Sequence, residues 1–209
     1  MDASTARPTP IPDRAFIAAR LAAGLPLEAL LTSDDVERHQ ALEEHAARAA
    51  AVLLLIVGRE RPTVVFTRRT AHLADHAGQI SFPGGRRDEG DLTPEANALR
   101  ESHEEVGLDA KSVEILGRLP DYRTVTGYTV VPIVGWIDPP LELHPDPHEV
   151  EEVFEVPLDF LLDASNHRQE TAYIRGQLRR YWAMPYGDHY IWGATAGMLV
   201  TFQRVLAGG

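Results

Sequence analysis

The sequence predicts an α/β or α+β fold, in which a mixed β-sheet lies between helices and a helical extension precedes it. Short runs rich in Val, Leu and Ile alternate with segments in which apolar residues recur at helical spacing. The 209 residues, 44% of them hydrophobic, suffice for one substantial core and fall short of two ordinary domains. The apolar run Ala49 to Val57 is too short to cross a membrane as a helix, so we interpret it as a buried strand.

The remaining elements follow in chain order. The first dozen residues are rich in Pro, Ser and Thr and are expected to be disordered. Helical spacing continues over residues 13–23 and 34–50, so we expect an extension over 1–48 and a main domain over 49–209. Gly58 and Pro62 favour a hairpin connection between the first two strands. The predicted strands cover 52–57, 63–67, 79–82, 113–119, 129–136, 152–156, 178–183 and 189–192, and the later helices cover 94–106 and 194–206.

Composition excludes several classes of function. A net charge of −11 argues against nucleic-acid binding, which depends on clustered Lys and Arg. The absence of cysteine excludes disulfides, thiolate metal sites and a cysteine nucleophile. The N-terminus has no apolar segment after a basic start, so we expect a cytoplasmic protein with no membrane association.

The helix at 94–106 carries an unusual acidic pattern. Thr93 and Pro94 mark its start, and Gly107 marks its end. At about 100° per residue, the three glutamates of its second half fall on one side, namely Glu101, Glu104 and Glu105. Such carboxylates suit Mg²⁺, although an acidic face exposed to solvent is the simpler interpretation of the pattern alone.

The neighbouring sequence favours the metal site. Gly84 and Gly85 permit a tight turn that presents backbone groups to a ligand, and Arg100 adjoins the acidic group and is expected to orient a glutamate. By contrast, His72 and His76 lack the glutamate and third ligand of a zinc site, so we interpret them as loop or surface residues.

The run GRRDEGDLTPEANALRESHEEVGL, from Gly85 to Leu108, resembles the Nudix box, G-x5-E-x7-R-E-U-x-E-E-x-G-U, where U is a bulky aliphatic residue. Ser102 stands at the first U position, Asp91 replaces the first glutamate, and one extra residue separates Asp91 from Arg100. The resemblance implies a Nudix fold and a pyrophosphohydrolase that uses Mg²⁺ or Mn²⁺.

A second resemblance indicates which class of substrate the enzyme hydrolyses. Thr67, Arg69, Gly78 and the run Phe82-Pro83-Gly84-Gly85 match the signature of coenzyme A pyrophosphatases, whereas Thr70 and Ala74 depart from it. This resemblance implies hydrolysis of coenzyme A to 4′-phosphopantetheine and adenosine 3′,5′-bisphosphate. Another nucleoside diphosphate derivative, such as ADP-ribose or a dinucleotide, is the alternative, since Ala74 replaces an arginine of the signature.

The resemblance also assigns roles to residues. Glu101, Glu105 and the carbonyl of Gly85 are implied metal ligands, and Glu104 is either a third ligand or the group that polarises water. Arg100 is expected to orient a glutamate. Substrate binding is implied for Arg69, Gly78, Phe82, Pro83 and Gly84.

In many Nudix enzymes the general base lies outside the box, so Glu149 and Glu152 are candidates, although they belong to a charge run that is typical of a solvated face. Two non-enzymatic alternatives stay open, a nucleotide-binding domain without catalysis and a structural metal site. The superfamily also makes a homodimer an open expectation.

Overall fold

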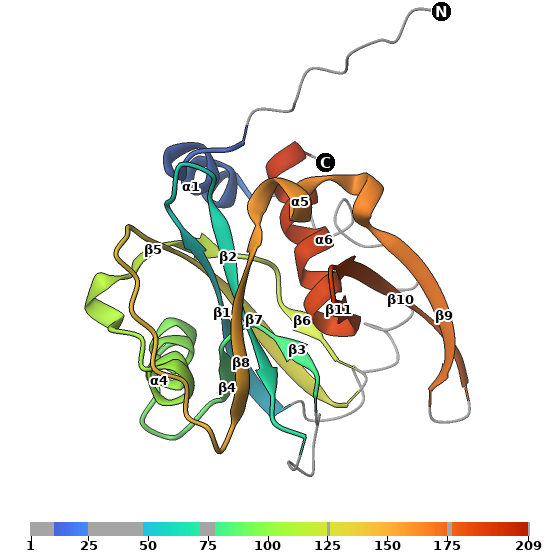
Figure 1. Ribbon diagram of the computed structural model, residues 1–209, viewed down its shortest axis with the longest axis horizontal. Coiled ribbons are helices and arrows are strands. Elements are labelled where there is room, and N and C mark those ends of the chain that lie inside the picture. The colour runs from blue at the N-terminus through green and yellow to red at the C-terminus, as the bar shows by residue number, and fades with distance from the viewer. Residues whose placement is uncertain (1–10, 25–47, 72–77, 125, 175–176, 209) are drawn as a thin grey trace, which may run out of the picture.

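The computed structural model describes residues 11–24, 48–71, 78–124, 126–174 and 177–208 (Figure 1). Its helices are α1 (Arg14–Ala23), α4 (Pro94–Val106), α5 (Leu158–Leu162) and α6 (Gly193–Ala207), with 3₁₀ turns at Ala110–Ser112 and Ala164–Asn166. None of the described helices has the length and apolar character needed to cross a membrane.

The main sheet has β1 at its centre. Its strands are β1 (Arg48–Val57), β2 (Thr63–Arg69), β3 (Ile80–Ser81), β4 (Gly84–Arg86), β5 (Glu114–Arg118), β6 (Tyr122–Arg123), β7 (Tyr128–Ile137) and β8 (Val150–Pro157). β1 pairs in parallel with β7 along its whole length. On the opposite edge of β1, β4 pairs with its first half and β2 with its end, both antiparallel. The sheet is therefore mixed, as predicted.

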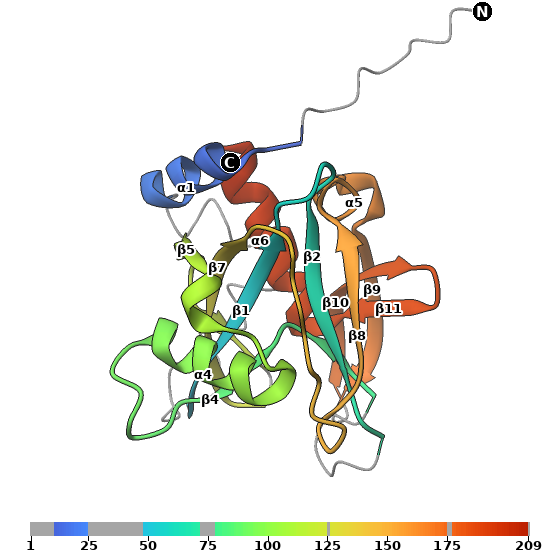
Figure 2. The same ribbon diagram turned by 60° about the vertical axis from the view of Figure 1, so that its left-hand side comes forward.

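Each face of β1 supplies a separate hydrophobic core. Successive side chains of a strand point to opposite faces, so Leu54 and Ile56 face α1 and α6, while Leu53 and Leu55 face α4. All four are fully buried. Figure 2 shows the same layering, with α4 on one side of the sheet and α6 on the other. The helices therefore lie on both faces, as the sequence predicted.

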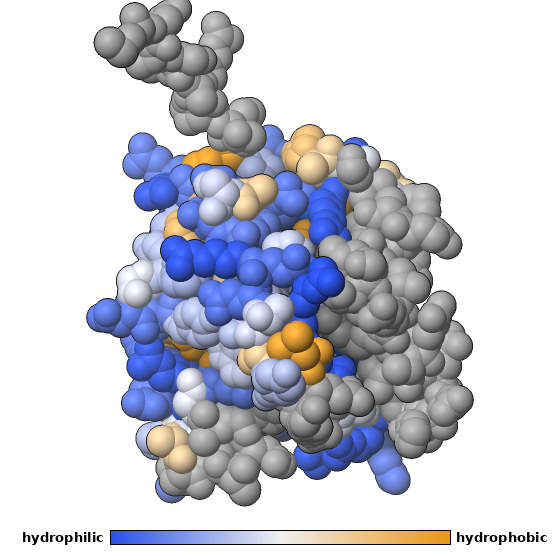
Figure 3. All heavy atoms as spheres, turned by 90° about the vertical axis from the view of Figure 1, so that its right-hand side faces the viewer, coloured by the Kyte–Doolittle hydropathy of each residue, from blue (hydrophilic) through white to orange (hydrophobic). Residues whose placement is uncertain are grey.

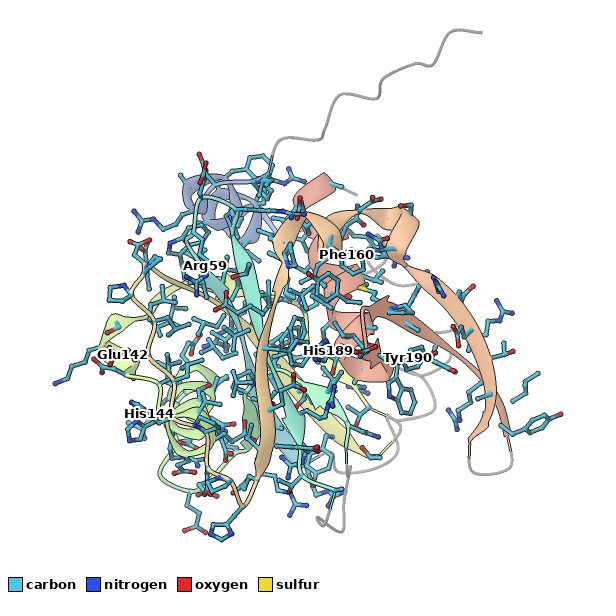
Figure 4. All side chains as sticks on the ribbon, in the orientation of Figure 1. Arg59, Glu142, His144, Phe160, His189 and Tyr190 are labelled. Carbon is cyan, nitrogen blue, oxygen red and sulfur yellow. The ribbon has the colours of Figure 1, made fainter. Side chains whose placement is uncertain are left out.

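The late strands form a second sheet rather than extending the first. β9 (Arg168–Ile174), β10 (Gln177–Tyr186) and β11 (His189–Trp192) pair antiparallel in the order β11-β10-β9. His189 of β11 points back toward β8 in Figure 4, where its ring stacks on Phe154 with centroids 3.7 Å apart. On the side of the molecule shown in Figure 3, apolar side chains form small separate patches among hydrophilic ones.

Most predicted elements are confirmed to within a few residues, and the helix at 94–106 and the strand at 189–192 agree at both ends. The predicted helix over 34–50 is wrong at its end, because Arg48 to Ala50 pair with β7 as the start of β1. The rest of that helix and the loop with His72 and His76 lie outside the described residues. α1 packs its buried Ile17 and Leu21 into the core beside α6, and a domain boundary at residue 48 stays a prediction.

Candidate functional site

The helix α4 carries the acidic residues and is capped at both ends. Thr93 accepts a hydrogen bond from the amide of Ala96 at 3.2 Å, and Pro94 occupies the first turn. Gly107 ends the helix in the left-handed conformation with φ of 68°, and its amide donates to the carbonyl of His103. These caps fix where the helix begins and ends, and therefore which residues face the sheet.

β4 lies against the acidic side of α4. Gly84 and Gly85 pair with Val52 and Ala51 of β1, so the expected glycine turn is a short strand. A Cβ added at Gly85 would overlap the carboxylate of Glu101, and one added at Gly84 would lie 2.6 Å from the Cα of Val52. Only glycine at these two positions lets β4 approach both β1 and Glu101 this closely.

Glu105 is buried at the junction of α4, β4 and β2. Its carboxylate accepts a hydrogen bond from the Gly84 amide at 3.1 Å, and the Arg69 guanidinium lies 3.4 Å away. Burial raises the pKa of Glu105 to about 7, and the negative charges of Glu101 and Glu149 also raise it. The Gly84 amide and Arg69 oppose this rise in pKa. The charged form of Glu105 is therefore disfavoured by its surroundings, and a bound cation would favour it.

Glu101 lies beside Glu105 on the same side of α4, and its side chain is 18% exposed. Burial raises its pKa, and Glu104 and Glu149 add to the rise, whereas Arg100 opposes it. These two carboxylates next to a glycine strand form an acidic pair whose charge favours cation binding.

Arg100 holds the surrounding acidic groups in place. Its guanidinium donates to both oxygens of the buried Asp91, at 3.1 and 2.9 Å, and to Glu101 at 2.8 Å and Glu104 at 2.9 Å. It also donates to the carbonyl of Arg86 at 3.0 Å, which ties α4 to β4. Asp91, which replaces the first glutamate of the box, therefore anchors Arg100 and has no oxygen directed at the Glu101 and Glu105 pair.

The three glutamates do not form the single arc expected from helical spacing. Glu105 faces the sheet and is buried, whereas Glu104 is 55% exposed and bonded to Arg100. Among the described residues, no three Asp, Glu or His side chains are arranged as a closed metal-ligand set. The physical reason is Arg100, whose guanidinium draws Glu104 and one oxygen of Glu101 toward itself.

The two candidate bases lie in different places. Glu149 precedes β8 and is close enough to Glu101 and Glu105 for its charge to raise their pKa values. Glu152 instead forms an ion pair with Arg68 and contacts His189, each at 3.2 Å. Phe154, two residues after Glu152 on β8, packs in the core on the α6 side of the sheet, so Glu152 lies on the face away from Glu105. The cluster of Arg68, Glu152 and His189 was not predicted, because it depends on how the second sheet docks.

The implied substrate-binding residues divide into two groups. Arg69 lies in the site, next to Glu105. The Gly78 amide donates to the Arg69 carbonyl at 3.1 Å, so Gly78 has a structural role between β2 and β3. The ring of Phe82 is buried and stacks on Phe66, with centroids 5.2 Å apart, and Pro83 is also buried. These two side chains position Gly84 and Gly85, and neither is available for direct contact with a substrate.

Comparison with known proteins is consistent with this geometry. The NUDIX domain family matches residues 46–176, more than half of the chain. The chain belongs to the Nudix family. It is 45% identical over 152 residues to NudL, an uncharacterized Nudix hydrolase of Escherichia fergusonii, covering 73% of this chain and 79% of the relative. NudL of Enterobacter sp. (strain 638) is 42% identical over 176 residues, covering 81% of this chain and 92% of that protein.

Solved Nudix structures are also similar. RenU of M. smegmatis matches with a TM-score of 0.48 and 27% identity, over 58% of this chain and 80% of that chain. A MutT/nudix protein of Enterococcus faecalis matches with a TM-score of 0.48 and 15% identity, over 91% of this chain and 72% of that chain.

The residues of this Nudix site fit a divalent cation. Glu101 and Glu105 offer hard oxygen donors, and their pKa values are raised mainly by burial and further by neighbouring negative charges, an effect that a bound cation would oppose. Glu104 is exposed, and its side chain would have to leave its ion pair with Arg100 to join the other two. The carbonyl of Gly85 is a further candidate ligand, and its role stays a prediction.

Proposed function

We propose that this Nudix hydrolase cleaves the diphosphate bond of coenzyme A or its derivatives, giving 4′-phosphopantetheine and adenosine 3′,5′-bisphosphate. The observation that carries the proposal is the position of Arg69. This residue belongs to the segment that resembles coenzyme A pyrophosphatases, and its guanidinium lies 3.4 Å from the buried Glu105. A guanidinium that can bind phosphate, placed beside a carboxylate that can bind a metal, supports hydrolysis of a diphosphate.

The chain supplies the following groups to the reaction. Glu101, Glu105 and Glu104 would hold Mg²⁺ or Mn²⁺, which when bound neutralises charge on the phosphoryl oxygens. Arg69 binds a phosphate oxygen and orients the diphosphate. Arg100 keeps Glu101 against Gly85 and is a positioning residue. Glu149 lies nearer to the pair than Glu152 and is the preferred group to accept the proton of the attacking water.

Product analysis tests the proposal. The purified protein is incubated with coenzyme A, ADP-ribose and a dinucleotide, with and without Mg²⁺ or Mn²⁺, and the products are identified by mass. We expect metal-dependent conversion of coenzyme A to the two named products. Turnover of ADP-ribose or the dinucleotide in its place would support the alternative substrate class.

Matched variants separate catalysis from binding. Glu104→Gln should lower turnover at least about a hundredfold with an unchanged circular dichroism spectrum. Glu151→Gln, an exposed substitution on β8, is the control and should be close to wild type. Strong thermal stabilisation by Mg²⁺ with no turnover of any substrate would instead indicate a structural metal site. Nucleotide binding without turnover would indicate a domain that only binds.

A further inference from the structure

A second cationic site lies on the opposite face of β4, next to the residue that contacts Glu101. The guanidinium carbons of Arg48 and Arg86 lie over the ring of Tyr128, at 4.1 and 5.5 Å from its centroid. Both arginines are exposed, and Tyr128 is half-buried. We refer to these three residues as the arginine–tyrosine cluster.

The strand register explains why these side chains meet. Arg48 is paired with Tyr128 on β7, and Ala50 is paired with Arg86 on β4. Residues two apart on β1 share a face, so all three side chains of the cluster point to the side of the sheet away from α4. Gly85 faces Glu101 and Arg86 faces the cluster, although the two residues are neighbours in the chain.

Within the described part of the chain, no carboxylate forms an ion pair with Arg48 or Arg86, although the protein carries a net charge of −11. Arg48 donates to the carbonyl of Thr126 at 3.1 Å, which fixes its direction. Two guanidinium groups within about 6 Å of one ring centroid make a doubly positive cluster, which suits a dianionic ligand.

The cluster is rigidly connected to the catalytic helix. The carbonyl of Arg86 accepts hydrogen bonds from Asn97 at 2.9 Å and from Arg100 at 3.0 Å, and both donors belong to α4. Among the described strands, β4 pairs only with β1, so its outer edge has no strand beside it. The acidic pair and the cluster therefore lie on opposite faces of one short strand, and Arg100 contacts both Glu101 and the Arg86 carbonyl.

We propose that Arg48 and Arg86, supported by Tyr128, bind a terminal phosphomonoester of the substrate, separate from the diphosphate that is cleaved. This inference rests on the proposed function, since coenzyme A carries such a group at its ribose 3′ position and ADP-ribose does not. Guanidinium groups bind phosphate through paired charge-assisted hydrogen bonds, which gives the site its selectivity. The cluster then determines specificity and takes no part in bond cleavage.

Kinetics with coenzyme A and 3′-dephospho-coenzyme A test the proposal. The wild type should prefer coenzyme A, and Arg86→Gln and Arg48→Gln should each lower kcat/KM for coenzyme A about tenfold, mainly through KM. The same variants should change kcat/KM for the dephospho substrate less than about twofold. Arg14→Gln is the control, because it removes an equal charge from α1, whose Arg14 pairs with Glu114. An equal loss on both substrates, or no wild-type preference, would overturn the proposal and leave the proposed function intact.

A binding measurement keeps the test independent of turnover. Calorimetry should show tighter binding of adenosine 3′,5′-bisphosphate than of AMP, and Arg86→Gln should abolish the difference. If no coenzyme A is hydrolysed but this difference is present, the proposed function fails and the phosphomonoester site stands. If the two nucleotides bind equally to the wild type, the site proposal fails.

Discussion

Single residues decide the geometry of the site, and some of them could be predicted from the sequence. The Nudix-box pattern identified Arg100, Glu101 and Glu105, and the two glycines indicated a close backbone approach. Helical spacing alone could not show that Glu105 would be buried and Glu104 exposed, because burial depends on how α4 packs against β1 and β4. Nor could it show that Asp91 would reach Arg100 despite the extra residue between them.

Gly85→Ala should lower turnover at least about tenfold, because the new methyl group would displace the Glu101 carboxylate. The displaced atoms are the end of a flexible side chain, so the melting temperature should change little. Gly90→Ala is the matched control, since a Cβ at Gly90 meets no atom within 4 Å. Equal activity of the two variants would show that the position of Glu101 is unimportant.

Asp91→Asn should change how stability depends on pH. Hydrogen bonds from Arg100 lower the pKa of Asp91 below its ordinary value of 3.8, so the folded state keeps this charge more strongly than the unfolded chain. The ionised Asp91 therefore stabilises the folded state at pH values above 3.8. This contribution is lost as the pH falls through the lower pKa that Asp91 has in the folded state. Urea unfolding between about pH 5 and pH 3 should show a smaller loss of stability in Asp91→Asn than in the wild type. The same dependence of unfolding free energy on pH in both proteins would show that the charge of Asp91 does not stabilise the fold.

At the scale of elements, the sequence predicted structures that carry strong local signals. The helix α4 begins at Pro94 and ends at Val106 as expected, because Thr93 and Gly107 cap it. β4 was missed because its glycines have no strand propensity and its pairing with β1 is tertiary. β9 was missed because RQETAYI is largely polar, and α5 because it has only five residues. Glu152 could not be placed without knowing that β11 docks beside it.

Thr93→Ala should lower the free energy of unfolding by about 1 kcal/mol, because the amide of Ala96 loses its acceptor at the start of α4. Thr93→Ser keeps a hydroxyl and should recover most of this loss. Chemical denaturation of the three proteins provides the measurement. An equal loss in both variants would indicate that the methyl group of Thr93, and not its hydroxyl, stabilises the helix.

At the scale of the whole molecule, α6 packs between the two sheets in one core, and α4 covers the second core on the opposite face of the main sheet. The sequence predicted one mixed sheet with helices on both sides and did not separate its two late strands, at 178–183 and 189–192, from that sheet, since local patterning does not specify which strands pair. His189 connects the sheets through its stack on Phe154 and its contact with Glu152. Contacts of this kind arise between segments far apart in the sequence, so only the folded chain shows them.

His189→Ala should reduce stability by roughly 1 kcal/mol and increase hydrogen exchange in β9, β10 and β11 more than in α4. His189→Phe keeps an aromatic ring and removes the contact with Glu152. It should therefore retain most of the protection if stacking provides the connection. Uniformly faster exchange across both sheets in His189→Ala would contradict a local role.

The glycine strand has a consequence for the alignment of β1. Because β1 is apolar on both faces, sliding it by one residue would still fill both cores, so hydrophobicity alone does not select its position. Gly84 packs directly on the backbone of Val52, and Gly85 packs on the side chain of Glu101. The position of β1 along the sheet and the distance between β4 and α4 therefore depend on the same pair of glycines. A bulkier residue at Gly84 would therefore push β4 away from β1. The position of Glu101 would change with it, and activity would be lost.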